Sequence, residues 1–304
     1  MSLLKLWLES KDVLDVRSFH VHEAMSGPFE ASIVAVSTNE DIDLEAVVGH
    51  EAIFFLGGPS PRHRFWKGLV SHVQEVQAEK TLPGMPALST YFLRVVPRLW
   101  RTTQRRGNRI FQHQSVPEIV GRIFTEHGVD HLSQLTESYP RQDYRVQYGE
   151  SDFAFVSRLL EEAGIGYFFE PFWEENADFG EGEPGDYRSV LVLSDRPGAR
   201  VKRETIAYAD NPNQGADFVS HLRLSHDTLP GRVTLRDYDF RKPDYALFGQ
   251  ATHSLPEEFL EQYRYEHGAF TTDQAGNRRA AVSLEGERRR KRNVTYASNC
   301  FDLY

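Results

Sequence analysis

Hydrophobic and polar residues alternate through the first hundred positions, with the period of β-strands that have one buried face. The alternation starts at the N-terminus, where Leu4, Leu6 and Leu8 are separated by Lys5 and Trp7. It recurs in three runs: Phe29, Ala31, Ile33 and Ala35; Phe65, Lys67, Leu69, Ser71 and Val73; and Tyr91, Leu93 and Val95. Glycine and proline pairs such as Gly27-Pro28 and Pro83-Gly84 separate these runs. The sequence therefore predicts an antiparallel barrel or sandwich over residues 1–108.

A helical period replaces the alternation further along the chain. Ser115 and Glu118 have the spacing of a capping box, and Pro117 is tolerated because the first turn of a helix leaves its amides unpaired. Gly128 is a typical helix stop. The apolar stripe of this predicted helix is formed by Val116, Ile119, Val120, Ile123 and Phe124.

A second helix is predicted to start at Ser151 and Asp152, because a carboxylate is favoured at the positive end of the helix dipole. Its apolar stripe is Phe155, Val156, Leu159 and Leu160, and Gly164 ends it before the aromatic strand 165–169. Strands and helices thus mix over residues 109–200, which indicates an α/β domain.

Strands return after Val201. Pro230-Gly231 is a predicted turn, and Val233, Leu235, Tyr238 and Phe240 are predicted to lie in one strand. A helix is expected over about residues 273–292, and another strand from Val294. Residues 201–304 are therefore a third predicted domain, and the fold class is α+β and mostly β.

Two stretches carry a family resemblance. Tyr139 to Ile165, with Val146-Gln147-Tyr148, Glu150-Ser151-Asp152 and Phe155-Val156-Ser157-Arg158-Leu159, resembles the valine-glycine repeat (VgrG) spike family of type VI secretion systems, related to the baseplate hubs of contractile phage tails. Arg109 to Gln112, Ser115 to Ile119, and Leu235 to Phe240 with Lys242-Pro243 are similar to other segments of the family. The chain departs from the family at Tyr263-Arg264-Tyr265-Glu266-His267-Gly268, where a Tyr-Pro-Gly turn is expected and the proline is missing.

The resemblance implies two antiparallel β-barrel-like tube domains around an inserted α/β domain. It implies a structural hub without cofactor: a homotrimer between a hexameric tube protein and a needle, in contact with baseplate proteins and an effector or needle-tip protein. The baseplate hub of a phage-like particle is the alternative, and a secreted hydrolase or toxin is the alternative of another class. The motif residues expected to matter structurally are Ser115, Pro117, Glu118, Gln147, Tyr148, Glu150, Ser151, Asp152, Phe155, Gly164, Asp237, Tyr238, Phe240 and Pro243.

The net charge and the composition limit the kinds of partner and site that the chain can have. The formal charge of -9 and the pI of about 5.8 oppose binding to a nucleic-acid backbone. Cys300 is the single cysteine, so an intrachain disulfide is excluded. No run approaches the ~20 apolar residues of a membrane span, and the start lacks the features of a cleaved signal peptide. We therefore expect assembly in the cytoplasm, export without a cleaved leader and no stable membrane insertion.

Ionisable clusters give few signs of a chemical site. His127, Asp130 and His131 could bind a transition metal, but a histidine near a helix C-terminus is favoured there anyway. Glu161 and Glu162 point about 100° apart on a helix, so they do not form a catalytic carboxylate pair.

Two charged segments remain. The acidic stretch 174–186 lacks the spacing of a calcium loop and is expected to be a solvated hairpin tip. The basic run 288–292 falls at a predicted helix end, where cations are favoured, so a helix-end and subunit-contact role is preferred over nucleic-acid binding.

Overall fold

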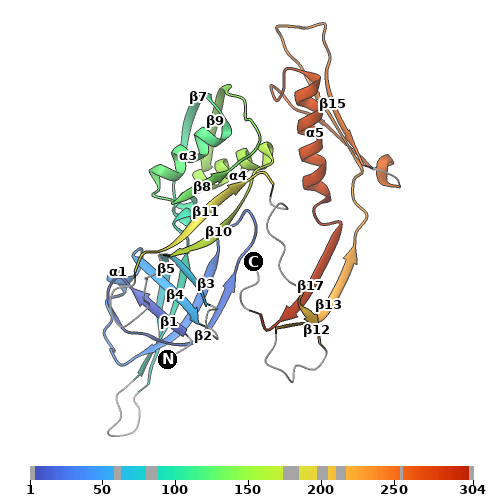
Figure 1. Ribbon diagram of the computed structural model, residues 1–304. Coiled ribbons are helices and arrows are strands. Elements are labelled where there is room, and N and C mark those ends of the chain that lie inside the picture. Colours follow the sequence, from blue (N-terminus) through green and yellow to red (C-terminus); the bar gives the residue numbers. More distant parts are fainter. Residues whose placement is uncertain are drawn as a thin grey trace. The chain divides into compact units, whose positions relative to one another are not determined.

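A computed structural model describes residues 4–57, 63–79, 88–173, 185–196, 205–209, 217–253 and 256–300. The chain forms two compact units, shown in Figure 1: Met1–Glu161 with Ile165–Ala199, and Glu162–Gly164 with Arg200–Tyr304. The predicted boundary at residue 108 falls inside the first unit. The division into three domains stays a prediction.

The first unit begins with a six-stranded antiparallel sheet in the order β1-β4-β5-β6-β3-β2. Its strands are β1 (Leu4–Leu8), β2 (Asp15–His22), β3 (Glu30–Ser37), β4 (Glu51–Gly57), β5 (His63–Glu79) and β6 (Leu88–Val96), with α1 (Leu44–Val47) before β4. Strands β3 and β6 alternate between buried and half-buried residues as their sequence predicts. Strand β5 begins at His63, which pairs with Gly57 of β4.

One core lies under this sheet, and both of its edge strands contribute to it. Leu8 from β1 and Val16 from β2 belong to the same buried cluster as Phe54, Trp66 and Leu93 from the central strands. Edge strands of a flat sheet cannot reach a common core, so the sheet curls into a barrel-like form. This curled, mostly β architecture agrees with the predicted fold class.

The rest of the first unit mixes helices and strands. After 3₁₀-helix η1 (Arg98–Trp100) and α2 (Arg101–Gln104), β7 (Arg106–Gln114) pairs with β9 (Gln142–Ser151) in a two-stranded antiparallel sheet. Helices α3 (Val116–Glu126) and α4 (Asp152–Ala163) follow these strands. A second sheet has the order β10-β11-β8, with β10 (Gly166–Trp173), β11 (Tyr187–Ser194) and β8 (His131–Gln134).

Both helices form where the sequence predicts them. All the residues of the two predicted apolar stripes are buried. Gly128 has a φ of 64° just after α3, and Gly164 has a φ of 70° just after α4, a conformation that glycine adopts without strain. Strands β10 and β11 flank the predicted hairpin tip; residues 174–184 lie outside the described residues.

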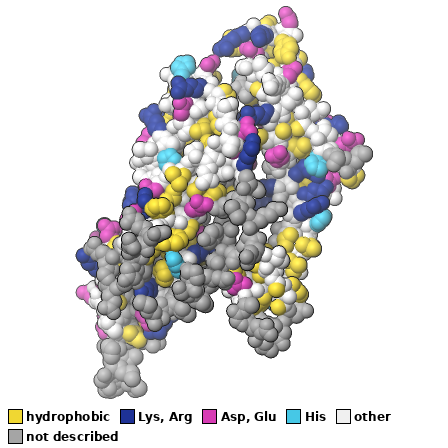
Figure 2. All heavy atoms as spheres, in the orientation of Figure 1, with side chains coloured by type: hydrophobic (Ala, Val, Ile, Leu, Met, Phe, Trp, Pro, Cys, Tyr) yellow, Lys and Arg dark blue, Asp and Glu magenta, His cyan; other side chains and the backbone are white. Residues whose placement is uncertain are grey.

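The second unit contains two three-stranded sheets and one long helix. The first sheet has the order β12-β13-β17, with β12 (Ala207–Tyr208), β13 (Phe218–His226) and β17 (Arg292–Ser298). Figure 2 shows hydrophobic side chains gathered over it. The second has the order β15-β14-β16, with β14 (Arg232–Asp237), β15 (Leu247–Thr252) and β16 (Glu261–Tyr265); 3₁₀-helix η3 (Glu257–Phe259) precedes β16. The pairs β12–β13 and β14–β16 are parallel.

Helix α5 (Asp273–Arg288) packs on β15 and β14, as Figure 1 shows. The closest approach is between two glycines: a Cβ on Gly249 would lie 2.3 Å from the carbonyl carbon of Gly276. The buried cluster beneath the helix contains Val233, Leu235 and Leu247.

Three boundaries in this unit differ from the predictions. Strand β14 ends at Asp237, whose carboxylate binds backbone amides of residues 268–270, and Tyr238 and Phe240 lie beyond the end of the strand. Helix α5 stops at Arg288, and Arg292 already belongs to β17.

In the described part of the chain, no helix is both long enough and apolar enough to cross a membrane.

Candidate functional site

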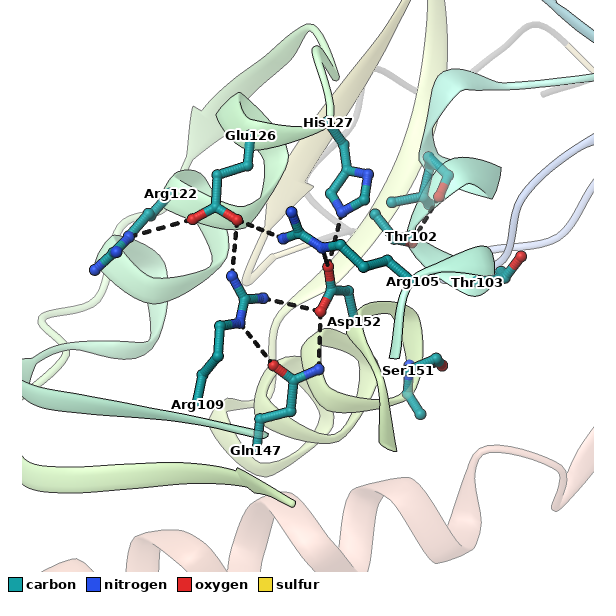
Figure 3. A network of polar contacts seen from close by, with 12 residues as sticks. Thr102, Thr103, Arg105, Arg109, Arg122, Glu126, His127, Gln147, Ser151 and Asp152 are labelled. Carbon is teal, nitrogen blue, oxygen red and sulfur yellow. Dashed lines mark hydrogen bonds and ion pairs between the residues drawn. The ribbon is translucent and has the colours of Figure 1, made fainter. Parts of the chain in front are cut away.

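A polar network joins the family-motif segments of the first unit (Figure 3). Its centre is Asp152, the first residue of α4, whose side chain is 1% exposed. Its other members come from the end of α2, from β7, from the C-terminal part of α3 and from β9: Arg105, Arg109, Arg122, Glu126, His127 and Gln147.

Each of the two carboxylate oxygens of Asp152 accepts two hydrogen bonds from side chains. Oδ1 accepts from Arg109 Nη2 at 2.8 Å and from Gln147 Nε2 at 2.8 Å. Oδ2 accepts from Arg105 Nε at 2.5 Å and from His127 Nε2 at 2.7 Å. An ionised carboxylate offers about four acceptor positions, so the side chains of this network occupy all of them.

Arg109 connects the three acceptors of the network. Besides Asp152, its guanidinium donates to Gln147 Oε1 at 2.9 Å and to Glu126 Oε2 at 2.7 Å. Glu126 also binds Arg105, and its Oε1 accepts from Arg122 at 3.3 Å. Gln147, from β9, is fully buried. The network therefore fixes both helices to the β7–β9 sheet.

Burial by itself raises the pKa of Asp152. Hydrogen bonds from His127, Gln147 and Arg105, together with the charge of Arg109, outweigh it and hold the pKa below its ordinary value. Asp152 therefore stays ionised at neutral pH. A carboxylate that is charged, buried and saturated with donors has no acceptor position left for a substrate, so the geometry suits a structural tie.

The remaining motif residues of this unit cap and brace the same elements. At the start of α3 the Glu118 carboxylate accepts from the Ser115 backbone amide at 2.7 Å, as the capping box predicts, and Pro117 lies in the first turn. Ser151 Oγ accepts from the Ala154 amide at the start of α4. Phe155 stacks on Phe111 of β7, with ring centroids 5.5 Å apart.

Glu150 and Tyr148, the neighbours of this network in β9, point elsewhere. Glu150 pairs with Arg158 at 2.6 Å, and Tyr148 is 84% exposed. The structure thus brings Gln147 and Asp152 into one network and leaves Tyr148 at the surface.

A second carboxylate organises the second unit. Asp237, 5% exposed, accepts hydrogen bonds from the backbone amides of Gly268, Ala269 and Phe270 at 2.9, 2.7 and 3.0 Å. Gly268 has a φ of 67°. The Asp237 carboxylate therefore fixes the conformation of the 268–270 turn, which lacks the proline expected from the family. Tyr238, Phe240 and Pro243 are exposed.

Two residues of the basic run 288–292 form ion pairs within the second unit. Glu257, 6% exposed, pairs with Lys291 and with Arg288 Nη1, the latter at 2.7 Å. Hydrogen bonds from Lys291 and Arg288 lower the pKa of Glu257 to about 2. These contacts agree with a helix-end role for part of the run.

His127 and His131, which the sequence offered as conceivable metal ligands, have other partners in the structure. His127 is bound to Asp152, whereas His131 Nδ1 contacts the backbone carbonyl of Val129 at 3.1 Å. Among the described residues no cluster of histidine, cysteine and carboxylate side chains is arranged to hold a metal ion.

Sequence reasoning missed Arg105, Arg122 and Glu126. Arg122 and Glu126 lie four residues apart on a predicted helix, which is a local signal for an ion pair. Arg105 and Asp152 are 47 positions apart, and no local pattern connects them.

Comparisons with known proteins agree with this scaffold. Residues 22–304 match the family model described as phage tail baseplate hub (GPD). The type VI secretion system spike protein VgrG1a of Pseudomonas aeruginosa is 31% identical over an alignment of 297 residues, and the match covers 93% of this chain and 43% of that protein. VgrG4b of the same species is 34% identical over 285 residues, 92% of this chain and 33% of that protein. The chain therefore spans less than half the length of these curated relatives.

Solved structures give the same picture. The Escherichia coli c3393 protein, described as a component of the type VI secretion system with structural similarity to phage T4 tail proteins gp27 and gp5, superposes with a TM-score of 0.58 at 25% identity, covering 73% of this chain and 56% of that one. A tail protein of Neisseria meningitidis shares the fold with a TM-score of 0.61 at 11% identity, covering 97% of this chain and 79% of that one. The chain belongs to the phage tail baseplate hub family, and its resemblance to the VgrG spike proteins is confirmed.

Proposed function

We propose that this chain is a structural hub of a type VI secretion spike. Three copies form a ring that links a hexameric tube protein to a needle, contacts baseplate proteins and carries an effector or needle-tip protein. It assembles in the cytoplasm and leaves the cell through the secretion machine. The motif residues act as scaffold in this role.

The family match over residues 22–304, with spike proteins among the relatives, carries the proposal. The geometry of the motif residues supports it. Asp152 and Asp237 are buried, and their carboxylates are occupied by side-chain or backbone donors of the chain itself. Residues used in this way stabilise a scaffold and present no reactive group to a substrate.

The mass of the native assembly tests the proposal. Light scattering or native mass spectrometry of the purified chain should give three times the mass of one chain, and the trimer should bind the tube protein encoded beside it. A persistent monomer at tens of micromolar that also fails to bind the tube would contradict the proposal.

A hub of a phage-like particle is the second candidate, favoured by the family's description and by the shared fold of the Neisseria tail protein. The identity of the neighbouring genes would distinguish a secretion-system hub from a hub of a phage-like particle. Sheath, tube and ATPase genes of a secretion system support the first, and capsid genes support the second.

A hydrolase or toxin activity remains the alternative of another class. Incubation of the purified protein with peptidoglycan and with nucleic acid is the direct test. Turnover that is lost on substituting a single carboxylate would establish an enzyme.

A further inference from the structure

The β7–β9 sheet has an exposed face without charge. Ile110 of β7 pairs with Val146 of β9, and Tyr144 and Tyr148 lie two residues to either side of Val146 on the same face. These four residues, the β7–β9 face, are 38% to 84% exposed. The opposite face carries the buried Phe111 and Gln147 and packs on the helices. The apolar side chains of this sheet therefore point away from the unit they belong to.

The β12–β13–β17 sheet has an exposed apolar patch, with the His226–Arg292 pair at one end of the same side. Leu224 pairs with Val294, and Leu222 and Tyr296 are the next residues on that side of their strands. These four residues, the β13–β17 face, are 46% to 70% exposed. Residues between them, such as Arg223 and Thr295, give the other side of the sheet a polar character.

Each face offers roughly 400 Å² of apolar side-chain surface, on the scale of the largest patch that ordinary monomers expose. Interface centres are depleted of charge and enriched in tyrosine, and all eight residues are uncharged, three of them tyrosines. Joined, the two faces would bury on the order of 800 Å², enough for the apolar centre of a standard interface with a polar rim. Their matched area and chemistry are what a contact between them requires.

A closed ring requires two different patches on each subunit, since every copy contacts its two neighbours through unlike surfaces. The β7–β9 face belongs to the first compact unit and the β13–β17 face to the second. We infer that the β7–β9 face of one copy binds the β13–β17 face of a second copy, and that this pair is the subunit interface. The inference rests on the proposed trimer and names the surfaces that form it.

Two single substitutions test this pairing. Tyr148→Glu places a charge on the first face and Leu224→Glu places one on the second. Both side chains are exposed, at 84% and 70%, so each variant is expected to fold, which circular dichroism and the unfolding midpoint verify. A charge buried at an apolar contact should weaken association at least about thirtyfold. Matched controls are Val76→Glu, an exposed apolar residue outside both faces, and Thr295→Glu, on the polar side of β17.

Mixing the variants gives the decisive measurement. Tyr148→Glu keeps an intact β13–β17 face, and Leu224→Glu keeps an intact β7–β9 face. Each alone should sediment as a monomer, whereas the equimolar mixture should form a one-to-one dimer that cannot close into a ring. Both controls should remain trimers.

Other outcomes overturn the inference in distinguishable ways. Variants that stay trimeric, or that dimerise with themselves, would show that the faces are not paired, while the proposed hub function stands. A mixture that fails to associate would also refute the pairing. A wild-type chain that remains monomeric at tens of micromolar would refute the inference and count against the trimer itself.

Discussion

Replacing Asp152 by asparagine removes the charge at the centre of the polar network and keeps the shape of the side chain. The carboxylate accepts from two arginines, a histidine and a glutamine, and it is 1% exposed. The amide of asparagine can accept at its oxygen only, and its NH₂ group would face Arg or His donors. We therefore expect two donors to lose their acceptor.

The size of the effect follows from burial. Removing one partner of a buried ion pair costs about 3–5 kcal/mol, because the other charge stays buried without compensation. Arg105 and Arg109 are 44% and 27% exposed, so water can partly solvate them. The lower end, about 3 kcal/mol, is expected, which corresponds to a fall of roughly 6–12 °C in the unfolding midpoint of a domain of 150–250 residues.

Differential scanning calorimetry of wild type, Asp152→Asn and a control measures this. The control is Glu150→Gln, two residues away, whose partner Arg158 is 40% exposed. Such a solvent-exposed pair is worth ~1 kcal/mol or less. If the two variants unfold within about 1 kcal/mol of each other, the network does not hold the helices and this reasoning is wrong.

The pH dependence gives a second readout. The pKa of Asp152 is lowered in the folded protein, so its stabilising contribution is complete above its unfolded-state pKa near 3.8 and is lost as the pH falls through the folded pKa. The stability gap between wild type and Asp152→Asn should therefore be constant at neutral pH and narrow below about pH 4. A gap that widens on acidification would contradict this assignment.

Three further changes are predicted in the second unit, each checked by calorimetry. Gly249→Ala places a methyl group 2.3 Å from the Gly276 backbone and should cost about 1–3 kcal/mol, whereas Gly286→Ala, with no atom within 4 Å, should be neutral or slightly stabilising. Asp237→Ala leaves three backbone amides of the 268–270 turn without their acceptor and should cost about 2–3 kcal/mol. The pKa of Glu257 is lowered to about 2, so its contribution should be lost as the pH falls from about 4.5 towards 2, and Glu257→Gln should remove that pH dependence.

Local order was predictable because its causes lie within a few residues. The capping box at Ser115, the Ser151 cap and the left-handed glycines after α3 and α4 bound the two helices without help from distant residues. Alternation likewise identified the strands of the first sheet. The motif at Asp237 was singled out by its family resemblance, and its role in the 268–270 turn was not predicted.

Strand β9 shows where pattern reasoning fails. Tyr144, Val146 and Tyr148 alternate with Arg145 and Gln147, and by hydrophobicity alone the tyrosines and valine would face inward. The structure inverts this arrangement: Gln147 is fully buried and Tyr148 is 84% exposed. The inversion is stable because the side chain of Gln147 is hydrogen-bonded on the inner side. Its Oε1 accepts from Arg109 and its Nε2 donates to Asp152.

The helices, most strands, the mostly β class and the family could be inferred from the amino-acid sequence, since each depends on neighbours in the chain or on motifs of a few residues. The folded structure was needed to show which sheet curls over a core, which face of β9 turns inward and which carboxylates are buried. Those features depend on partners such as Arg105 and Asp152, 47 positions apart, whose attraction exists only after the backbone has brought them within hydrogen-bonding distance.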